Sequence, residues 1–204
     1  MFEDFNYNLN AGIPITMKGV YLHKITPQSE DQKVLIDCLE DLRNGDYYTL
    51  LISGNTGLGK TYLVQALANT VIADNMAGDT ERAVRYTTHF GLDLKLRSTM
   101  ANGYKGRSEF EIIEEYKRYK LLIIDEIGRG TATDFMMNRL EYIVCERMAR
   151  GRKTILITNK TIDELQSVFD RQMQDRLGIM DGGNTENKTS RFLVLNGPSL
   201  RGSL

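Results

Sequence analysis

Residues 54–61 read Gly-Asn-Thr-Gly-Leu-Gly-Lys-Thr and fit the pattern G-x-x-x-x-G-K-[ST]. An apolar run, residues 48–53, precedes this stretch, and a segment of helical period, residues 60–76, follows it. A strand that turns through glycines into a helix is the context in which this pattern binds phosphate groups. We therefore prefer a phosphate-binding loop in an α/β fold to an ordinary glycine-rich turn.

Five short apolar runs, rich in β-branched residues, alternate with segments of helical period along the chain. This alternation is typical of βα units, which build a parallel sheet that helices cover on both faces. It predicts a five-stranded parallel sheet. The predicted strands are residues 48–53, 83–88, 121–125, 154–158 and 191–195.

Two pairs of residues mark the starts of helices. Ser29 with Gln32, and Thr161 with Glu164, have the spacing of a capping box, in which two side chains exchange hydrogen bonds with backbone amides. The first pair opens a helix that is expected to end near Gly45. Further helices are expected over residues 60–76 and 134–150.

Each part of the loop at residues 54–61 has a chemical role in binding a polyphosphate. The glycines let backbone amides converge on the phosphates, and the N-terminus of the following helix adds a favourable potential. Lys60 reaches the β and γ phosphates, and the Thr61 hydroxyl is a ligand for Mg²⁺. The candidate nucleotide-binding residues are Gly54, Asn55, Thr56, Gly57, Leu58, Gly59, Lys60 and Thr61.

Further candidates stand where two other predicted strands end. The apolar residues 121–124 run into Asp125 and Glu126, and residues 154–158 are followed by Asn159. Open α/β sheets bind ligands at this carboxyl edge. We expect Asp125 to hold Mg²⁺, Glu126 to polarise a water for attack on the γ phosphate, and Asn159 to orient that water. Taken alone, these residues would be an ordinary strand exit and turn, but the phosphate-binding loop favours a catalytic site.

In this order, the motifs make the chain resemble an AAA+ ATPase, and in detail the DnaC-type helicase loaders of bacteria and phages. The resemblance covers about residues 13–204. The related IstB transposition helpers usually have an Asn-Leu-Pro-Phe type sequence where residues 159–162 read Asn-Lys-Thr-Ile, so we prefer a loader. The matching stretches are Gly59-Lys60-Thr61-Tyr62-Leu63, Ile124-Asp125-Glu126-Ile127-Gly128, Thr158-Asn159, Asp175-Arg176-Leu177 and Asn196-Gly197-Pro198-Ser199-Leu200-Arg201.

The resemblance implies a P-loop fold that binds ATP or ADP with Mg²⁺, and hydrolysis that is completed by an arginine of a neighbouring subunit. Arg176 matches that arginine, with Arg171 as a rival, and Tyr62 and Arg201 join the nucleotide-binding residues. The implied partners are single-stranded DNA, a replicative hexameric helicase of DnaB type, and further copies of the chain in a ring or spiral. Full AAA+ proteins carry a helical lid after the last strand. Only eight residues follow Asn196, so we expect no lid here.

Basic residues cluster between the second and third predicted strands, and a phenylalanine follows the third. Basic side chains that track phosphates and an aromatic ring on which a base stacks are the usual parts of sequence-tolerant binding to single strands. The alternative is a solvated basic loop and a core phenylalanine. The candidate DNA-binding residues are Lys95, Arg97, Lys105, Arg107 and Phe135.

Residues 1–12 precede the recognisable ATPase domain, which we place at residues 13–204. Phe2, Phe5 and Leu9 are spaced i, i+3 and i+7. They would share one face of a helix, the arrangement of a peptide that docks in a groove of a partner such as the helicase. A frayed tail, or a strand packed on this chain's own core, is an equal alternative.

Composition excludes several classes of protein. The 26 basic and 27 acidic residues give a net charge of −1, which argues against a general polyanion binder, so any DNA contact must come from a local patch. The two cysteines, Cys38 and Cys145, lack the spacing of a zinc site or a disulfide framework. No run of about 18 apolar residues occurs and the N-terminus is acidic, so we expect a soluble, cytoplasmic protein. Two other functions remain as alternatives to a helicase loader. They are a P-loop kinase for small molecules and an ATP-binding adaptor with little turnover.

Overall fold

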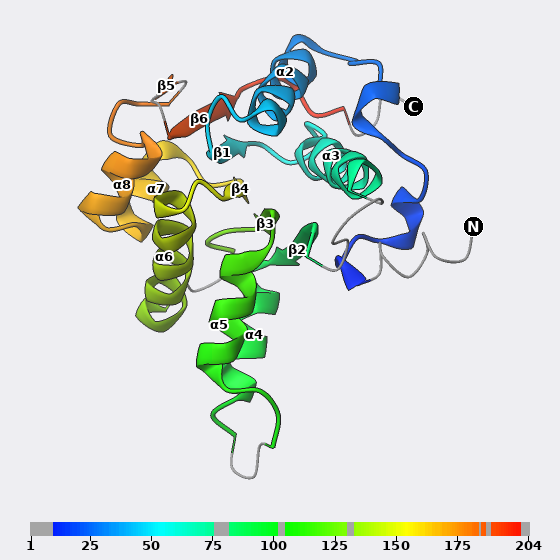
Figure 1. Cartoon of the computed structure of the whole chain (residues 1–204). Coiled ribbons are helices and arrows are strands. Elements are labelled where there is room, and N and C mark those ends of the chain that lie inside the picture. Colours follow the sequence, from blue (N-terminus) through cyan, green and yellow to red (C-terminus); the bar gives the residue numbers. More distant parts are fainter. Residues whose placement is uncertain are drawn as a thin grey trace.

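The computed structural model describes residues 10–75, 82–101, 105–129, 133–183, 185–186 and 189–200 (Figure 1). Its six-stranded sheet has the order β2-β3-β4-β1-β6-β5, in which every neighbouring pair is parallel except β5 and β6. The strands are β1 (Thr49–Gly54), β2 (Val84–Thr88), β3 (Leu121–Asp125), β4 (Lys153–Ile157), β5 (Thr185–Glu186) and β6 (Ser190–Leu195).

The five predicted parallel strands are confirmed, each to within one residue at either end. Strand β1 lies between β4 and β6, with Thr49 opposite both Thr154 and Ser190. Because helices cover both faces of such a sheet, its strands read as continuous apolar runs. The two-residue strand β5, antiparallel to β6, was not predicted, since a run this short has no periodicity to detect.

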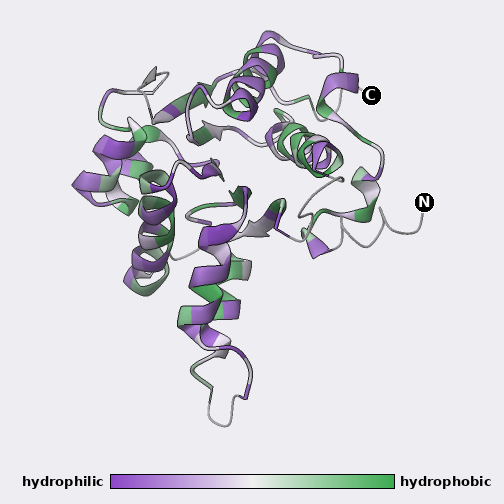
Figure 2. Cartoon of the chain, in the orientation of Figure 1, coloured by the Kyte–Doolittle hydropathy of each residue, from purple (hydrophilic) through white to green (hydrophobic). Residues whose placement is uncertain are grey.

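Two apolar cores form on the two faces of the sheet, and alternate strand residues supply them. Leu50 and Ile52 of β1 belong to one core, and Leu51 belongs to the other. The first core is covered by η1 (Ile15–Met17), η2 (Leu22–Lys24), α2 (Glu30–Asn44) and α3 (Lys60–Asp74). The second is covered by α4 (His89–Ser98), α5 (Glu109–Arg118), α6 (Asp134–Ala149), α7 (Ile162–Val168) and α8 (Arg171–Leu177). The outward sides of α6 and α8 are largely hydrophilic (Figure 2).

The predicted helix starts are present, with one difference in detail. Thr161 and Glu164 form the complete capping box that opens α7. The Ser29 hydroxyl accepts from the Gln32 amide at 3.2 Å, but the Gln32 side chain accepts from the Gln28 amide at 2.8 Å. Helix α2 ends as expected before Gly45, which has a left-handed φ of 97°. Helix α3 ends at Asp74, two residues before the predicted end.

A buried arginine joins α6 to the strands that carry the candidate site. Arg147 is 0% exposed, and its Nη1 donates to the carbonyls of Tyr116 at 2.9 Å and Tyr119 at 2.8 Å. Its Nε donates to the hydroxyl of Thr154 in β4 at 2.9 Å. These bonds hold the segment that enters β3 beside the start of β4.

The polypeptide after β6 is extended over residues 196–200, and no helix follows β6 in the described part of the chain. The expectation that the fold carries no C-terminal lid agrees with this. None of the helices in the described ranges combines the length and the apolar character that crossing a membrane needs.

Candidate functional site

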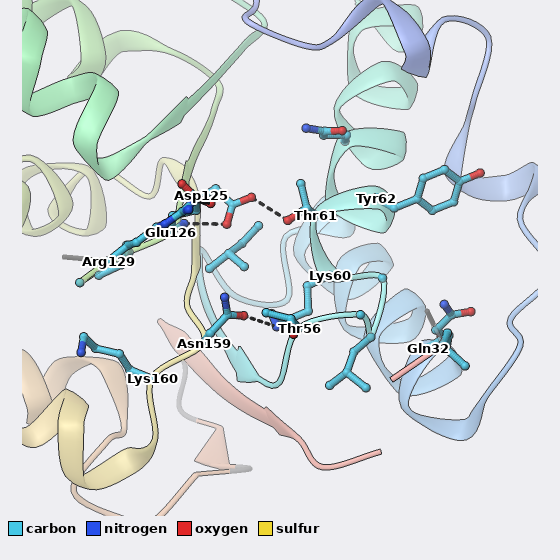
Figure 3. A pocket seen from close by; sticks show the side chains of 18 of the residues that line it. Gln32, Thr56, Lys60, Thr61, Tyr62, Asp125, Glu126, Arg129, Asn159 and Lys160 are labelled. Atoms are coloured by element: carbon cyan, nitrogen blue, oxygen red, sulfur yellow. Dashed lines mark hydrogen bonds and ion pairs between the residues drawn. The ribbon is translucent and has the colours of Figure 1, made fainter. Parts of the chain in front are cut away.

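A cleft of about 1140 Å³ opens at the carboxyl edge of the sheet, where the loop after β1 meets the ends of β3 and β4 (Figure 3). It contains most of the candidate nucleotide-binding and catalytic residues. Its lining includes Thr56, Gly57, Leu58, Gly59, Lys60, Thr61, Tyr62, Asp125, Glu126 and Asn159. Residues that the sequence places far apart therefore share one cavity, because parallel strands end at the same edge.

The loop at residues 54–59 needs glycine for steric reasons. Gly54 has a φ of 151°, and a Cβ added there would lie 2.6 Å from the carbonyl oxygen of Leu195. Gly59 is the N-cap of α3 with a left-handed φ of 82°, and a Cβ there would lie 2.7 Å from the Gln32 side-chain nitrogen. Side chains at either position would be strained and would collide with a neighbour.

Lys60 lies at the centre of the cleft, and its ammonium group is fully engaged. The Nζ donates to the carbonyls of Gly54 at 2.5 Å and Asn55 at 2.8 Å, and to Oδ1 of Asn159 at 2.8 Å. Burial lowers the pKa of Lys60 to about 8, while the negative charge of Asp125 opposes that shift. The loop is thus folded around a desolvated cation, which a bound anion would stabilise.

Both carboxylate oxygens of Asp125 accept hydrogen bonds. Oδ2 accepts from the Thr61 hydroxyl at 2.7 Å and from the Tyr86 hydroxyl at 2.9 Å, and Oδ1 accepts from the Glu126 amide at 2.6 Å. Burial and the neighbouring Asp125 charge raise the pKa of Tyr86. Tyr86 was not predicted, because its contact with Asp125 depends on the pairing of β2 with β3.

The Thr61 hydroxyl and the Asp125 carboxylate are hard oxygen donors that suit Mg²⁺. The described residues hold no group of three or more metal-ligating side chains. A Mg²⁺ ion here would therefore complete its coordination with water and phosphate oxygens, as is usual for this ion.

Glu126 occupies a strained position at the end of β3. Its φ is 57°, and it is the only residue other than glycine with a positive φ among those the structure describes. Strained backbone of this kind clusters at functional sites. Its carboxylate forms an ion pair with Arg129 at the mouth of the cleft. The role of Arg129 was not predicted, since an arginine three residues after a glutamate is common on any surface.

A different set of residues closes the other end of the cleft. Gln28, Gln32 and Leu200 line it, and the Leu200 amide donates to the Gly57 carbonyl at 3.0 Å. Tyr62 is 45% exposed and points away from Asp125 (Figure 3). Arg201, which the resemblance adds to the nucleotide-binding residues, lies outside the described residues.

The two candidate finger arginines lie away from this cleft. Arg176, in the last turn of α8, donates from Nη1 to the Cys145 sulfur at 2.7 Å, and its carbonyl accepts from the Ser190 hydroxyl at 2.6 Å. Arg171 is exposed at the start of the same helix. Neither contributes to the cleft of the same chain, since neither is among the residues that line it.

The candidate DNA-binding residues form two groups. Arg97 pairs with Asp93 at 2.8 Å, and its guanidinium lies 4.8 Å from the Phe135 ring centre. Arg139 covers the same ring at 3.9 Å. The second group is centred on Glu115, which forms ion pairs with Lys95 and Arg107. Lys105 is exposed.

Sequence reasoning missed the acidic partners in these groups. Residues 111–120 carry acidic and basic residues at helical spacing, which is typical of a solvated helix face, yet Glu115 is largely covered and forms ion pairs with basic residues. The docking candidates Phe2, Phe5 and Leu9 lie outside the described residues.

Comparison with known proteins gives both a family and curated relatives. Residues 28–181 match the sequence model of the IstB-like ATP binding proteins. The chain is 25% identical over 158 residues to the replicative helicase loader DnaC of Escherichia coli strain K12, which covers 78% of this chain and 58% of that protein. It is also 25% identical over 205 residues to a putative ATP-binding protein of a Mycobacterium tuberculosis insertion sequence, covering 98% of this chain and 67% of that protein. The chain thus spans little more than half the length of the curated loader.

Solved structures share the architecture. AMPPCP-bound DnaA from Aquifex aeolicus superposes with a TM-score of 0.68 at 18% identity, covering 90% of this chain and 51% of that one. The crystal structure of the DnaC helicase loader superposes with a TM-score of 0.65 at 16% identity, covering 89% of this chain and 99% of that one. At this level of identity the likeness concerns the fold, which is the α/β P-loop fold of AAA+ proteins.

Proposed function

The chain belongs to the IstB-like ATP-binding protein family, and we propose that its cleft binds ATP with Mg²⁺ and hydrolyses it to control a helicase-loading assembly. One observation carries the proposal. Lys60, Thr61, Asp125 and Asn159 come from three different elements, and hydrogen bonds of 2.7–2.8 Å join them in one cleft.

The loop and its lysine bind the triphosphate in this proposal. Lys60 exchanges the carbonyls of Gly54 and Asn55 for phosphate oxygens, and the amides at the start of α3 face the same phosphates. Thr61 and Asp125 hold the Mg²⁺ ion, which neutralises charge on the phosphates when it is bound. Tyr86 supports Asp125 by donating to the carboxylate.

Glu126 acts as the base that polarises the attacking water, and Asn159 orients that water. Arg176 of one subunit reaches the γ phosphate in the cleft of its neighbour. Its distance from the cleft of its own subunit supports a role between subunits. An arginine finger contributes about 10³ to 10⁵ in rate in related phosphoryl transfers.

The proposed partners are single-stranded DNA and a replicative helicase of DnaB type. The DnaC relative supports the helicase, and the Arg97–Phe135 contact supports DNA binding, because a guanidinium beside an aromatic ring suits a phosphate next to a base. The helicase-loading assembly contains several copies of the chain.

Co-purification of the full chain with a DnaB-type helicase, with ATP and with ADP, tests this function. We expect the complex to depend on the nucleotide, and the Lys60→Ala variant to lose that dependence. If the same amount of helicase co-purifies with the chain in ATP, in ADP and without nucleotide, the proposal is contradicted.

Assistance of transposition is the second candidate, because the alignment with the insertion-sequence protein covers nearly the whole chain. The same retention assay, with an insertion-sequence transposase in place of the helicase, separates the two candidates. Retention of the transposase but not of the helicase would favour the second.

A further inference from the structure

The residues after β6 reach the nucleotide cleft, which Leu200 lines, and the amides of Gly197 and Leu200 tie them to other segments. We call residues 196–200 the C-terminal strap. The Gly197 amide donates to Oδ2 of Asp31 at 2.6 Å, and the Leu200 amide donates to the Gly57 carbonyl at 3.0 Å. The first bond ties the strap to helix α2, and the second ties it to the phosphate-binding loop.

The Asp31 contact is short and sterically specific. A carboxylate that accepts from a backbone amide makes a charge-assisted hydrogen bond, which is stronger than a neutral one. A Cβ added to Gly197 would lie 2.7 Å from the same Oδ2 atom, so a larger residue would push the strap away. The approach of Asp31 to the strap therefore depends on glycine at position 197.

The residue next to Asp31 contacts the phosphate-binding loop directly. Gln32 is buried at 7% exposure, and its side-chain nitrogen lies 2.7 Å from the place of a Cβ on Gly59. The Gln32 carbonyl oxygen is fixed by the Gln28 amide at 2.8 Å. The first turn of α2 thus reaches the loop through Gln32 and reaches it again through Asp31 and the strap.

Helix α2 is a suitable anchor for the strap. Its first turn is capped by Ser29, and Asp41 near its other end pairs with Arg191 of β6 at 3.2 Å. The buried face of the helix contributes Leu35, Leu39 and Leu42 to the first core. Because α2 is fixed in this way, Asp31 on its first turn holds Gly197 of the strap in one place.

We propose that Asp31 is a positioning residue for the bound nucleotide. Asp31 does not line the cleft, but it holds the strap so that Leu200 stays against Gly57 and forms a wall of the cleft. Release of the strap opens that wall, and the nucleotide leaves faster. This inference rests on the proposed binding of ATP in the cleft.

The sign of the effect separates this role from simple electrostatics. Asp31 carries a negative charge near a site for a polyphosphate. If that charge were its only influence, its removal would reduce repulsion and slow the dissociation of ATP. If Asp31 positions the strap, its removal speeds dissociation.

The experiment measures the dissociation rate of a fluorescent ATP analogue from the full chain. We expect Asp31→Ala to raise the rate about tenfold, the scale of a hydrogen bond to a charged group. Gly197→Pro removes the amide donor and should raise it similarly, and the double variant should be no faster than either single one. Glu30→Ala is the matched control, because it removes the same charge from the same helical turn, and its rate should equal or fall slightly below that of the parent.

Three results would overturn the inference. In the first, the dissociation rate of the analogue from Asp31→Ala equals or falls below the rate from Glu30→Ala. A purely structural role of Asp31 predicts this result, together with a lower melting temperature of Asp31→Ala without nucleotide. In the second, the effects of Asp31→Ala and Gly197→Pro multiply in the double variant, so that the two residues act separately. In the third, the parent binds no analogue, which also overturns the proposed function, whereas the first two leave ATP binding intact.

Discussion

The Lys60 ammonium donates a hydrogen bond of 2.8 Å to Oδ1 of Asn159, and this bond joins the helix after β1 to the end of β4. Two loop carbonyls accept the other hydrogen bonds of the same ammonium. An ammonium has three N–H groups, so a phosphate must displace at least one of these acceptors. All three N–H groups of the Lys60 ammonium are therefore engaged within the protein, and we expect ATP binding to exchange some of these hydrogen bonds for bonds to phosphate oxygens.

This exchange predicts a pH dependence of ATP affinity. A phosphate stabilises the charged form of Lys60, so binding raises a pKa that is about 8 in the ligand-free protein. Above that pH the lysine must take up a proton when ATP binds, and the affinity should fall by up to about tenfold per pH unit. Calorimetric titrations in buffers of different ionisation enthalpy measure the proton uptake. Its absence above the pKa would contradict the exchange.

The same shift affects the stability of the ligand-free protein. The folded pKa lies below the ordinary lysine value of 10.5, so the unfolded state binds more protons between about pH 8 and that value. Burial of the charged Lys60 therefore destabilises the fold below about pH 8, and this cost disappears as the pH rises through the window. Urea unfolding at several pH values between about 8 and 10.5 measures this effect. The free energy of unfolding of the parent should rise with pH, and that of Lys60→Met should rise less.

Arg147 should matter greatly for stability. It is fully buried and donates to several carbonyls around the start of β3, so its replacement leaves buried acceptors without a donor. We expect Arg147→Met to lower the free energy of unfolding by about 3 kcal/mol. Arg150→Met, at the exposed end of the same helix, is the control and should change it by less than about 0.5 kcal/mol. Equal effects of the two variants in urea unfolding would contradict this account of Arg147.

An arginine that acts between subunits predicts complementation. Arg176→Ala should lose about a thousandfold in ATP hydrolysis, and Lys60→Ala should be inactive because it cannot hold the triphosphate. A mixture of the two variants should regain activity, since an intact cleft then meets an intact arginine. Arg171→Ala should behave like the parent. A mixture no more active than the sum of its parts would assign Arg176 a structural role beside Cys145.

The two basic groups on the second face of the sheet predict a salt-dependent interaction with DNA. Charge reversal at Arg97 or at Arg107 should weaken binding of single-stranded DNA and reduce the slope of log affinity against log salt by about 1 per lost phosphate contact. Lys33→Glu, on α2 at the opposite face, makes the same charge change and should leave the slope unaltered. Fluorescence anisotropy at several salt concentrations measures both. An equal loss in all three variants would indicate a general effect of net charge.

The sequence predicted the features that depend on the order of elements. The glycine loop, Asp125, Glu126 and Asn159 follow three buried parallel strands, so their meeting at one edge could be inferred from apolar runs alone. Tyr86, Arg129 and Asp31 could not be inferred in this way. Tyr86 reaches Asp125 only through the register of β2 and β3, and Asp31 reaches the strap only because α2 packs beside β6.

Long polar side chains were hard to predict for a related reason. In α6, Leu140, Ile143 and Val144 are buried at apolar positions of helical spacing, but Arg147 on the same face is buried too. Its burial depends on carbonyl groups of other segments, which leave no mark in the pattern of apolar residues. In the same way, Glu115 forms ion pairs with Lys95 of α4 and with Arg107, so the basic residues between β2 and β3 form two groups in space.

We propose that this cleft binds ATP and that Glu126 activates the water that attacks it. Single-turnover hydrolysis of bound ATP, compared between the parent and Glu126→Gln, measures the contribution of Glu126. We expect Glu126→Gln to bind ATP with an affinity within about threefold of the parent and to hydrolyse it at least about a hundredfold more slowly. Hydrolysis at the parental rate by Glu126→Gln would contradict the role of Glu126, and a parent that binds ATP without measurable turnover would contradict hydrolysis and favour an ATP-binding adaptor.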